Sequence, residues 1–159
     1  MGEGERSRAR LSLDDEQVFP ELFNSGYYLA SDKDAAYNCV AFAAGDTSRK
    51  WDPSAIPLPG YYWPENASRG RHPDDLRSAF ETIGYEICDL FDLEDGFEKV
   101  ALYVNHLGKW THAARQEANG DWASKLGDEE DIRHRSPHCF AGSLYGNVIY
   151  VMKRPAKDR

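Results

Sequence analysis

Two residues whose side chains together can perform acyl-transfer chemistry lie about seventy positions apart in the chain. Cys39 stands where a polar segment, residues 31–34, gives way to a run of small apolar residues that ends at Gly45. His112 lies in a second segment, residues 111–116. A cysteine thiolate is a strong nucleophile, and a histidine can hold the proton that the thiol gives up. The sequence therefore predicts a Cys/His pair whose partners meet through the fold rather than through adjacency in the chain.

The residues around Cys39 predict a short buried helix with the cysteine in its first turn. Free N–H groups and the macrodipole at a helix N-terminus stabilise negative charge, so this position would favour the thiolate. Asn38 could donate its side-chain amide to an oxyanion hole together with the Cys39 backbone N–H, or it could be the N-cap of the helix. The alternative for Cys39 is a small core residue among alanines. A core cysteine would not react until the protein unfolds, so thiol reactivity separates the two interpretations.

Length and composition restrict the class of protein. The chain has 159 residues, enough for a single domain with a sizeable core. We expect a disordered tail at residues 1–11, one domain at 12–154 and a flexible tail at 155–159. The formal charge of −8, with no basic stripe to offset it, argues against nucleic acid as a partner. The sequence shows no signal peptide or long apolar run, so we expect a cytoplasmic protein without a membrane partner.

The cysteines and histidines predict neither a disulfide framework nor a metal site. Cys39, Cys88 and Cys139 are odd in number and widely spaced, which leaves at least one free thiol. The ligand-type residues lack the short Cys-x-x-Cys or His-x-x-x-His spacing of zinc sites. We therefore expect no metal and no other cofactor. His134 is expected to bond a backbone carbonyl and fix its loop.

Breaker residues and apolar periodicity predict the elements that follow Cys39. Residues 46–71 combine several prolines with aromatic residues, so they predict a loop rather than a long regular element. Tyr62 and Trp63 in this loop could wall a substrate cleft, or they could pin an ordered loop to the core. A second helix is predicted from Pro73, with Gly84 as its C-terminal cap.

The second half of the chain predicts a mainly antiparallel sheet. Asn119 and Gly120 form the strongest hairpin signal, and residues 128–135 predict a charged turn or a helical piece. Alternation along the histidine strand places Trp110 and His112 on the same face. The fold class is therefore α+β. The expected strands cover residues 85–88, 99–104, 110–117, 122–126 and 147–152.

Six short segments together resemble the landmarks of an uncharacterised bacterial domain family. They are residues 37–43 (YNCVAFA), 62–64, 84–88, 111–116 (THAARQ), 122–127 (WASKLG) and 144–146. The similarity covers roughly residues 25–154. More distantly, the order of cysteine, His-Ala strand and tryptophan strand is similar to papain-like cysteine peptidases and to the transglutaminase core. This resemblance implies a papain-like fold, with N-terminal helices packed on a four- to five-stranded sheet, and acyl transfer with a third polar residue as orienter.

The third residue of the site has several candidates. Carried over by spacing from the histidine strand, it falls at Ser124 or Asp128, and Ser124 is favoured. A two-residue Asn-Gly turn would instead turn Lys125 towards His112. A different alignment, to cell-wall-cleaving peptidases, places Lys99 at their base position and His112 at their third position. Because Lys99 cannot act as an imidazole base, that alignment puts catalytic competence in doubt.

These observations lead to two hypotheses of function. The first is a cysteine hydrolase or acyltransferase that acts on an amide or thioester of a protein or peptide-like substrate, as a peptidase, amidase, deamidase or transglutaminase-like enzyme. Cys39 would attack, His112 would hold the proton, Ser124 would orient the imidazole and Asn38 would help bind the oxyanion. The second is a catalytically inactive papain-like binding or immunity-type module that uses residues 61–63 as a recognition surface.

Overall fold

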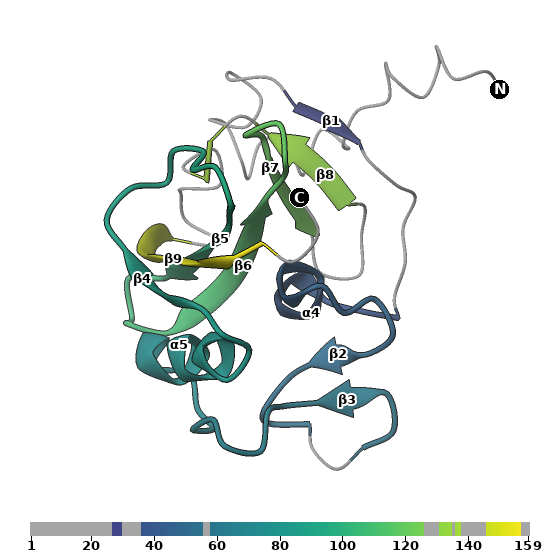
Figure 1. The fold of residues 1–159 in the computed structure, drawn as a ribbon. Helices are drawn as coiled ribbons and strands as arrows, with labels where there is room; N and C mark the ends of the chain where they lie inside the picture. Colours follow the sequence, from purple (N-terminus) through teal and green to yellow (C-terminus); the bar gives the residue numbers. More distant parts are fainter. Residues whose placement is uncertain are drawn as a thin grey trace, which may run out of the picture.

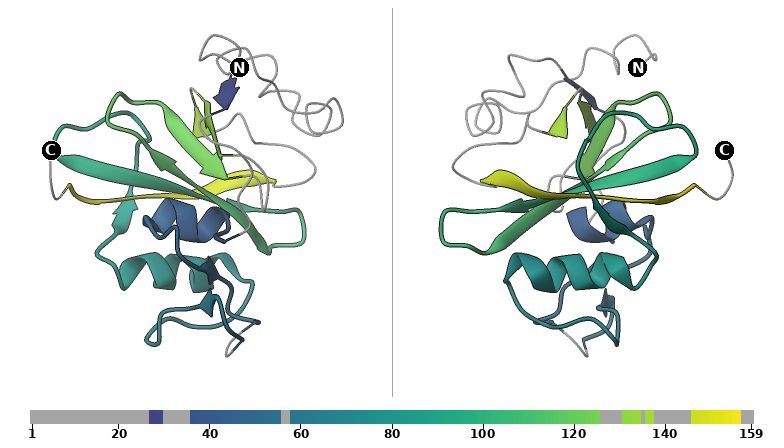
Figure 2. Two further views of the ribbon diagram at one scale, coloured as in Figure 1. Left: turned by 90° about the vertical axis from the view of Figure 1, so that its right-hand side faces the viewer. Right: turned by 60° about the vertical axis from the view of Figure 1, so that its left-hand side comes forward.

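The computed structural model describes residues 27–29, 36–55, 58–125, 131–134, 136–137 and 146–156. Within these ranges the chain forms an α+β structure in which a twisted sheet carries two short helices on one face (Figures 1 and 2). The elements are β1 (Tyr27–Leu29), α4 (Cys39–Ala44), β2 (Lys50–Trp51), β3 (Tyr61–Tyr62), α5 (Pro73–Glu81), β4 (Glu86–Cys88), β5 (Phe97–Val104), β6 (Trp110–Gln116), β7 (Trp122–Lys125), β8 (Asp131–His134) and β9 (Asn147–Pro155).

The described part of the sheet has seven strands in the order β1-β8-β7-β6-β5-β9-β4, and every neighbouring pair is antiparallel. The predicted antiparallel character is confirmed, and β5 is central as its apolar sequence indicated. The predicted number of strands was too low. β8 forms where a charged turn or helix was predicted, and it pairs with β1 on one side and β7 on the other.

The helix α4 is short because strong local signals bound it on both sides. The Asn38 side chain accepts the N–H of Ala41 at 3.0 Å as N-cap, and Gly45 ends the helix in the left-handed region at φ 88°. Its buried residues Val40, Ala41, Phe42 and Ala43 join the core on one face of the sheet. The predicted helix is confirmed, and Cys39 is its first residue.

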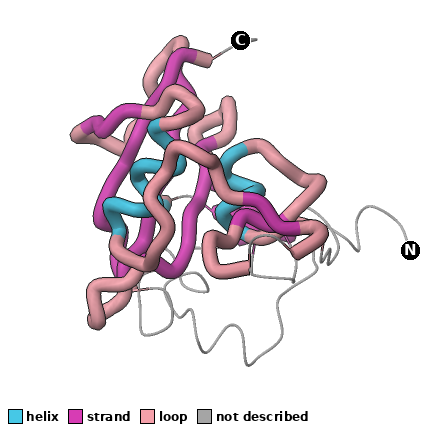
Figure 3. The backbone as a smooth tube through the Cα atoms, turned by 90° about the horizontal axis from the view of Figure 1, so that it is seen from below, coloured by secondary structure: helices cyan, strands magenta, loops and turns pink. Residues whose placement is uncertain are grey.

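The helix α5 packs on the same face, and it begins with a capping box. His72 Nδ1 accepts the N–H of Asp74 at 3.1 Å, and the Asp75 carboxylate accepts the N–H of His72 at 3.1 Å. Leu76, Ala79 and Phe80 are its fully buried residues. Seen from below, both helices are short relative to the strands of the sheet (Figure 3). The core therefore lies between these helices and the sheet.

A β-bulge on β6 changes which side chains share a face. The register places Tyr103 opposite His112 and Val104 opposite Trp110, so Thr111 is the extra residue. Trp110 consequently belongs to the core that the helices cover, whereas His112 packs against Tyr103. The expectation that Trp110 and His112 share a face is wrong, because strict alternation does not hold across a bulge.

The turn at Asn119 and Gly120 sets the register of β7. Glu117 donates its N–H to the carbonyl of Asp121 at 2.7 Å, which leaves a three-residue loop with Gly120 in the left-handed region at φ 95°. Gln116 then pairs with Trp122, and Arg115 pairs with Ala123. Compared with a two-residue turn, this register is shifted by one position, which exchanges the faces of the β7 side chains.

Candidate functional site

The thiol of Cys39 meets strand β6 beside the predicted histidine. The backbone N–H of Ala113, the peptide that follows His112, and the N–H of Val40 both lower the pKa of this thiol. Cys39 is a free thiol. The fold therefore packs the helix that begins at Cys39 against the strand that carries His112.

Strands β6 and β7 diverge at this place. Their ladder contains two pairs, at Arg115 and Gln116, although β6 reaches back to Trp110 and β7 continues to Lys125. Helix α4 packs against both strands where they separate. Ala113 has no side chain beyond Cβ and is fully buried in the core with α4, so the N-terminus of the helix can approach the strand closely.

His112 is held on the other face of the strand by three fully buried groups. Its ring contacts the Tyr103 ring edge-on, with centroids 5.0 Å apart. Its Nε2 lies 3.1 Å from the Ser124 hydroxyl, and the same hydroxyl lies 2.9 Å from Nε2 of His134. The predicted contact between Ser124 and His112 is present. His134 also makes the predicted bond to a backbone carbonyl, that of Ser136, at 2.7 Å.

The two other candidates for the third residue are not part of this cluster. Lys125 lies on the face that α4 covers, with Nζ 4.6 Å from the centroid of the Tyr37 ring. It is fully buried there, one position away from Ser124 and on the opposite face. Asp128 lies outside the described residues.

Burial sets the charge state of the thiol and the imidazole. Part of Cys39 reaches the surface, but its thiol is enclosed. Burial raises the pKa of the thiol to about 11. The nearby backbone N–H groups and the Arg71 charge lower this pKa, but their effect is smaller. Burial, and secondarily the neighbouring His134, lowers the pKa of His112 well below 6.5. The expected helix-stabilised thiolate is therefore wrong for the resting protein. Six residues give a short dipole, and desolvation outweighs it.

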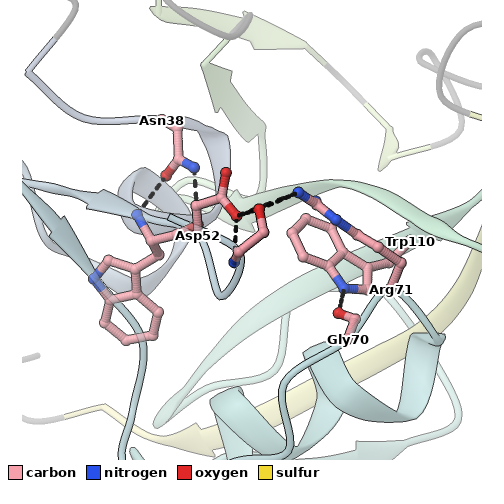
Figure 4. Close-up of polar contacts among 7 residues, drawn as sticks. Asn38, Asp52, Gly70, Arg71 and Trp110 are labelled. Atoms are coloured by element: carbon pink, nitrogen blue, oxygen red, sulfur yellow. Dashed lines mark hydrogen bonds and ion pairs between the residues drawn. The ribbon is translucent and has the colours of Figure 1, made fainter. Parts of the chain in front are cut away.

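Asn38 is the N-cap of α4 and also ties the helix to strand β2. Its Oδ1 accepts the N–H of Ala41 at 3.0 Å. The same oxygen accepts the N–H of Trp51 at 3.1 Å, and Nδ2 donates to the Trp51 carbonyl at 2.9 Å (Figure 4). These bonds fix the backbone immediately before Cys39. The N-cap interpretation of Asn38 is confirmed.

The aromatic loop contributes one surface ring and one core ring near this site. Trp63 is 3% exposed and stacks on Trp110 with centroids 5.9 Å apart, so it cannot offer its face to a substrate as predicted. Tyr62 is half-buried, and its ring contacts Trp51 while Arg49 lies 3.7 Å above its centroid. Only the interpretation of Trp63 as a residue that pins the loop agrees with its burial.

Arg71 is a residue near the thiol that the sequence did not indicate. Its guanidinium lies 4.3 Å from the centroid of the Trp110 ring and bonds the Asp52 carboxylate at 3.2 Å (Figure 4). Its positive charge lowers the pKa of Cys39, against the larger effect of burial. The residue is the last of segment 46–71, which the sequence predicted as a loop, and no pattern distinguished it there.

The fold and this site together define an α+β protein in which the first residue of an N-capped helix meets a strand that carries a buried histidine. Residues 28–153 match the model of the family described as Domain of unknown function (DUF7689), and the chain belongs to that family. No curated protein and no solved structure matches the chain. None of the helices in the described ranges is long and apolar enough to cross a membrane.

Proposed function

We propose that this domain is a cysteine hydrolase or acyltransferase that acts on an amide or thioester bond of a peptide-like substrate. The observation that supports this proposal is the convergence of two side chains on one peptide unit of β6. The N–H that follows His112 lowers the pKa of the Cys39 thiol, while Ser124 holds Nε2 of His112. This arrangement agrees with the papain-like resemblance, in which a third polar residue orients the histidine that serves the cysteine.

The charge states favour proton transfer that accompanies the attack, rather than a preformed ion pair. The thiol is protonated and the imidazole is neutral at rest. His112 projects from the face of β6 opposite α4, so the reaction requires its ring to meet the thiol at the place where β6 and β7 diverge. Nδ1 of His112 would then accept the S–H proton as the sulfur bonds to the carbonyl carbon. The carbonyl electron pair moves to oxygen, where the Cys39 N–H and the second N–H of the Asn38 amide would stabilise it.

Collapse of this intermediate completes the first half of the reaction. The carbonyl re-forms, the bond to the leaving amine or thiol breaks, and the leaving group takes the proton from His112. Cys39 then carries the acyl group as a thioester. Water, or an amine in a transfer reaction, gives a proton to His112 and attacks the thioester carbonyl. The sulfur leaves and recovers that proton, which restores the free thiol.

Covalent capture of the acyl group tests this proposal. The protein is incubated with peptide thioesters and peptide anilides, and peptide mapping by mass spectrometry assigns any acyl adduct to Cys39, Cys88 or Cys139. We expect the adduct at Cys39 and its loss in Cys39→Ala, with Cys88→Ala as the matched control because Cys88 is also free and partly exposed. Adducts shared between Cys39 and Cys88 would reject the proposal, since they would show only general thiol reactivity.

A specific surface observation favours the binding module as the second candidate function. Arg49 lies over Tyr62, and Lys50 Nζ lies 5.9 Å from the centroid of the Tyr61 ring. Beside them is a surface depression of about 330 Å³, which is lined by Ala36, Ser48, Lys50, Pro59, Gly60 and Tyr61. Cations on aromatic rings suit an acidic segment of a partner protein. Persistence of partner binding in Cys39→Ala, without any acyl adduct in the parent protein, would select this function.

A further inference from the structure

A chain of hydrogen bonds runs from the backbone through two buried histidines, His134 and His112, on the face of the sheet opposite α4. The Ser136 carbonyl lies 2.7 Å from Nδ1 of His134, whose Nε2 lies 2.9 Å from the Ser124 hydroxyl. The hydroxyl lies 3.1 Å from Nε2 of His112. Ser124 therefore stands between two imidazole nitrogens, and its single proton can serve one of them.

The direction of these bonds follows from the chemistry of each group. A carbonyl oxygen only accepts, so His134 must carry its proton on Nδ1. A neutral imidazole has one N–H, which makes Nε2 of His134 an acceptor for the Ser124 proton. Having donated that proton, Ser124 can only accept from His112. His112 is therefore protonated on Nε2, and its Nδ1 carries the lone pair.

We propose that His134 is a positioning residue that acts through Ser124 to fix His112 in the tautomer whose Nδ1 can accept a proton. The assignment of the tautomer rests on the hydrogen bonds together with the neutral state of the two buried rings, and its catalytic meaning rests on the proposed function. A serine alone would not fix this state, because its hydroxyl can donate to His112 as readily as accept from it.

The surroundings hold the chain of bonds in one arrangement. Ser124 and His134 lie on adjacent strands in a fixed register, with Trp122 paired to His134. The Tyr103 hydroxyl donates to the carbonyl of Pro137, so the segment that follows His134 is also anchored to β5. Burial lowers the pKa of His134 to about 4, which keeps that ring neutral near neutral pH.

The tautomer of His112 can be measured directly. Long-range proton–nitrogen spectra of the full chain, labelled with nitrogen-15, distinguish imidazole protonated on Nε2 from imidazole protonated on Nδ1, and loss of a signal in His112→Gln assigns it. At about pH 7, where a histidine with a pKa near 4 is neutral, we expect Nε2–H for His112 and Nδ1–H for His134. A wild-type His112 protonated on Nδ1 would overturn the proposal.

Two substitutions at one position separate positioning from packing. His134→Phe fills similar space without an acceptor, so Ser124 turns its proton to His112 and His112 changes to the Nδ1–H tautomer. His134→Gln keeps an acceptor near Nε2, so it restores the wild-type tautomer. An unchanged tautomer in folded His134→Phe would refute the proposal. If that variant does not fold, Ser124→Ala replaces it, and a single unchanged Nε2–H tautomer there would refute the proposal equally.

Acylation of Cys39 distinguishes failure of this inference from failure of the proposed function. We expect His134→Phe to slow acylation by at least about 10-fold, within the usual contribution of a general base, and His134→Gln to recover most of it. If the tautomer changes as expected but wild-type Cys39 is never acylated, the proposed function fails and the positioning of His112 stands. If Cys39 is acylated at one rate in all variants while the tautomer stays fixed, the positioning role fails.

Discussion

Acidification should destabilise this domain in a pH window set by its buried histidines. The pKa of His134 is lowered from 6.5 to about 4 in the folded state, so the unfolded chain takes up the proton first as the pH falls. Stability is therefore complete above about pH 6.5 and is lost as the pH falls towards about 4. This shift corresponds to about 3 kcal/mol in total, of which roughly 2 kcal/mol is already lost at about pH 5. His112 adds a loss of the same sign, because burial lowers its pKa as well.

Urea unfolding between about pH 7 and pH 5 measures this loss, and two substitutions assign it. His134→Gln removes one titrating group but keeps an acceptor for Ser124, so its free energy of unfolding should fall by about 2 kcal/mol less than that of the wild type over the same interval. His106→Gln is the matched control, since His106 is exposed and should leave the profile unchanged. The Asp46 carboxylate, whose pKa is lowered, loses its contribution only below about pH 4. Equal pH profiles for wild type and His134→Gln would refute the reasoning.

Four further substitutions test how the site is built, with urea unfolding as the common measurement. Asn38→Ala should cost about 1–2 kcal/mol, because it removes the N-cap of α4 and both bonds to Trp51; a cost of only a few tenths would contradict the capping role. Trp63→Ala should cost about 3–5 kcal/mol as a core truncation, whereas half-buried Tyr62→Ala should cost clearly less; the reverse order would show that the loop is packed differently. Ser124→Ala should cost about 1–3 kcal/mol, since it removes the shared partner of two buried imidazoles; a neutral effect would argue against the chain of hydrogen bonds.

The elements that the sequence predicted well are those whose own residues determine them. The helix at Cys39 has an N-cap at Asn38 and a glycine end at Gly45, and both signals are local. Strand β5 is apolar on both faces, which is typical of a central strand. The strands that were missed are short, with two to four residues each. β8 is charged, and β2 and β3 are two-residue strands in a proline-rich loop, so partners distant in sequence decide their conformation.

The contact between Ser124 and His112 was predictable, whereas the electrostatics of the candidate site was not. The papain-like resemblance favoured Ser124 beside His112, whereas a two-residue turn at Asn119 and Gly120 would have placed Lys125 there. The three-residue loop produces the register in which Ser124 makes the contact. The pKa of Cys39 was predicted with the wrong sign, because the sequence shows the helix start but not the depth at which the thiol is buried. The bulge at Thr111 was equally hidden, since it arises from pairing with β5.

The rate at which a peptide thioester acylates Cys39 in wild type and in His112→Gln tests the central claim most directly. Glutamine can still donate an N–H to Ser124 near the position of Nε2, but it has no base at the position of Nδ1, so the substitution removes proton transfer and preserves the contact. A Cys/His pair predicts acylation of Cys39 at neutral pH that is at least about 100-fold slower in His112→Gln. Equal rates in the two proteins, both folded by circular dichroism, would contradict the account and leave Cys39 as a core cysteine of a binding module.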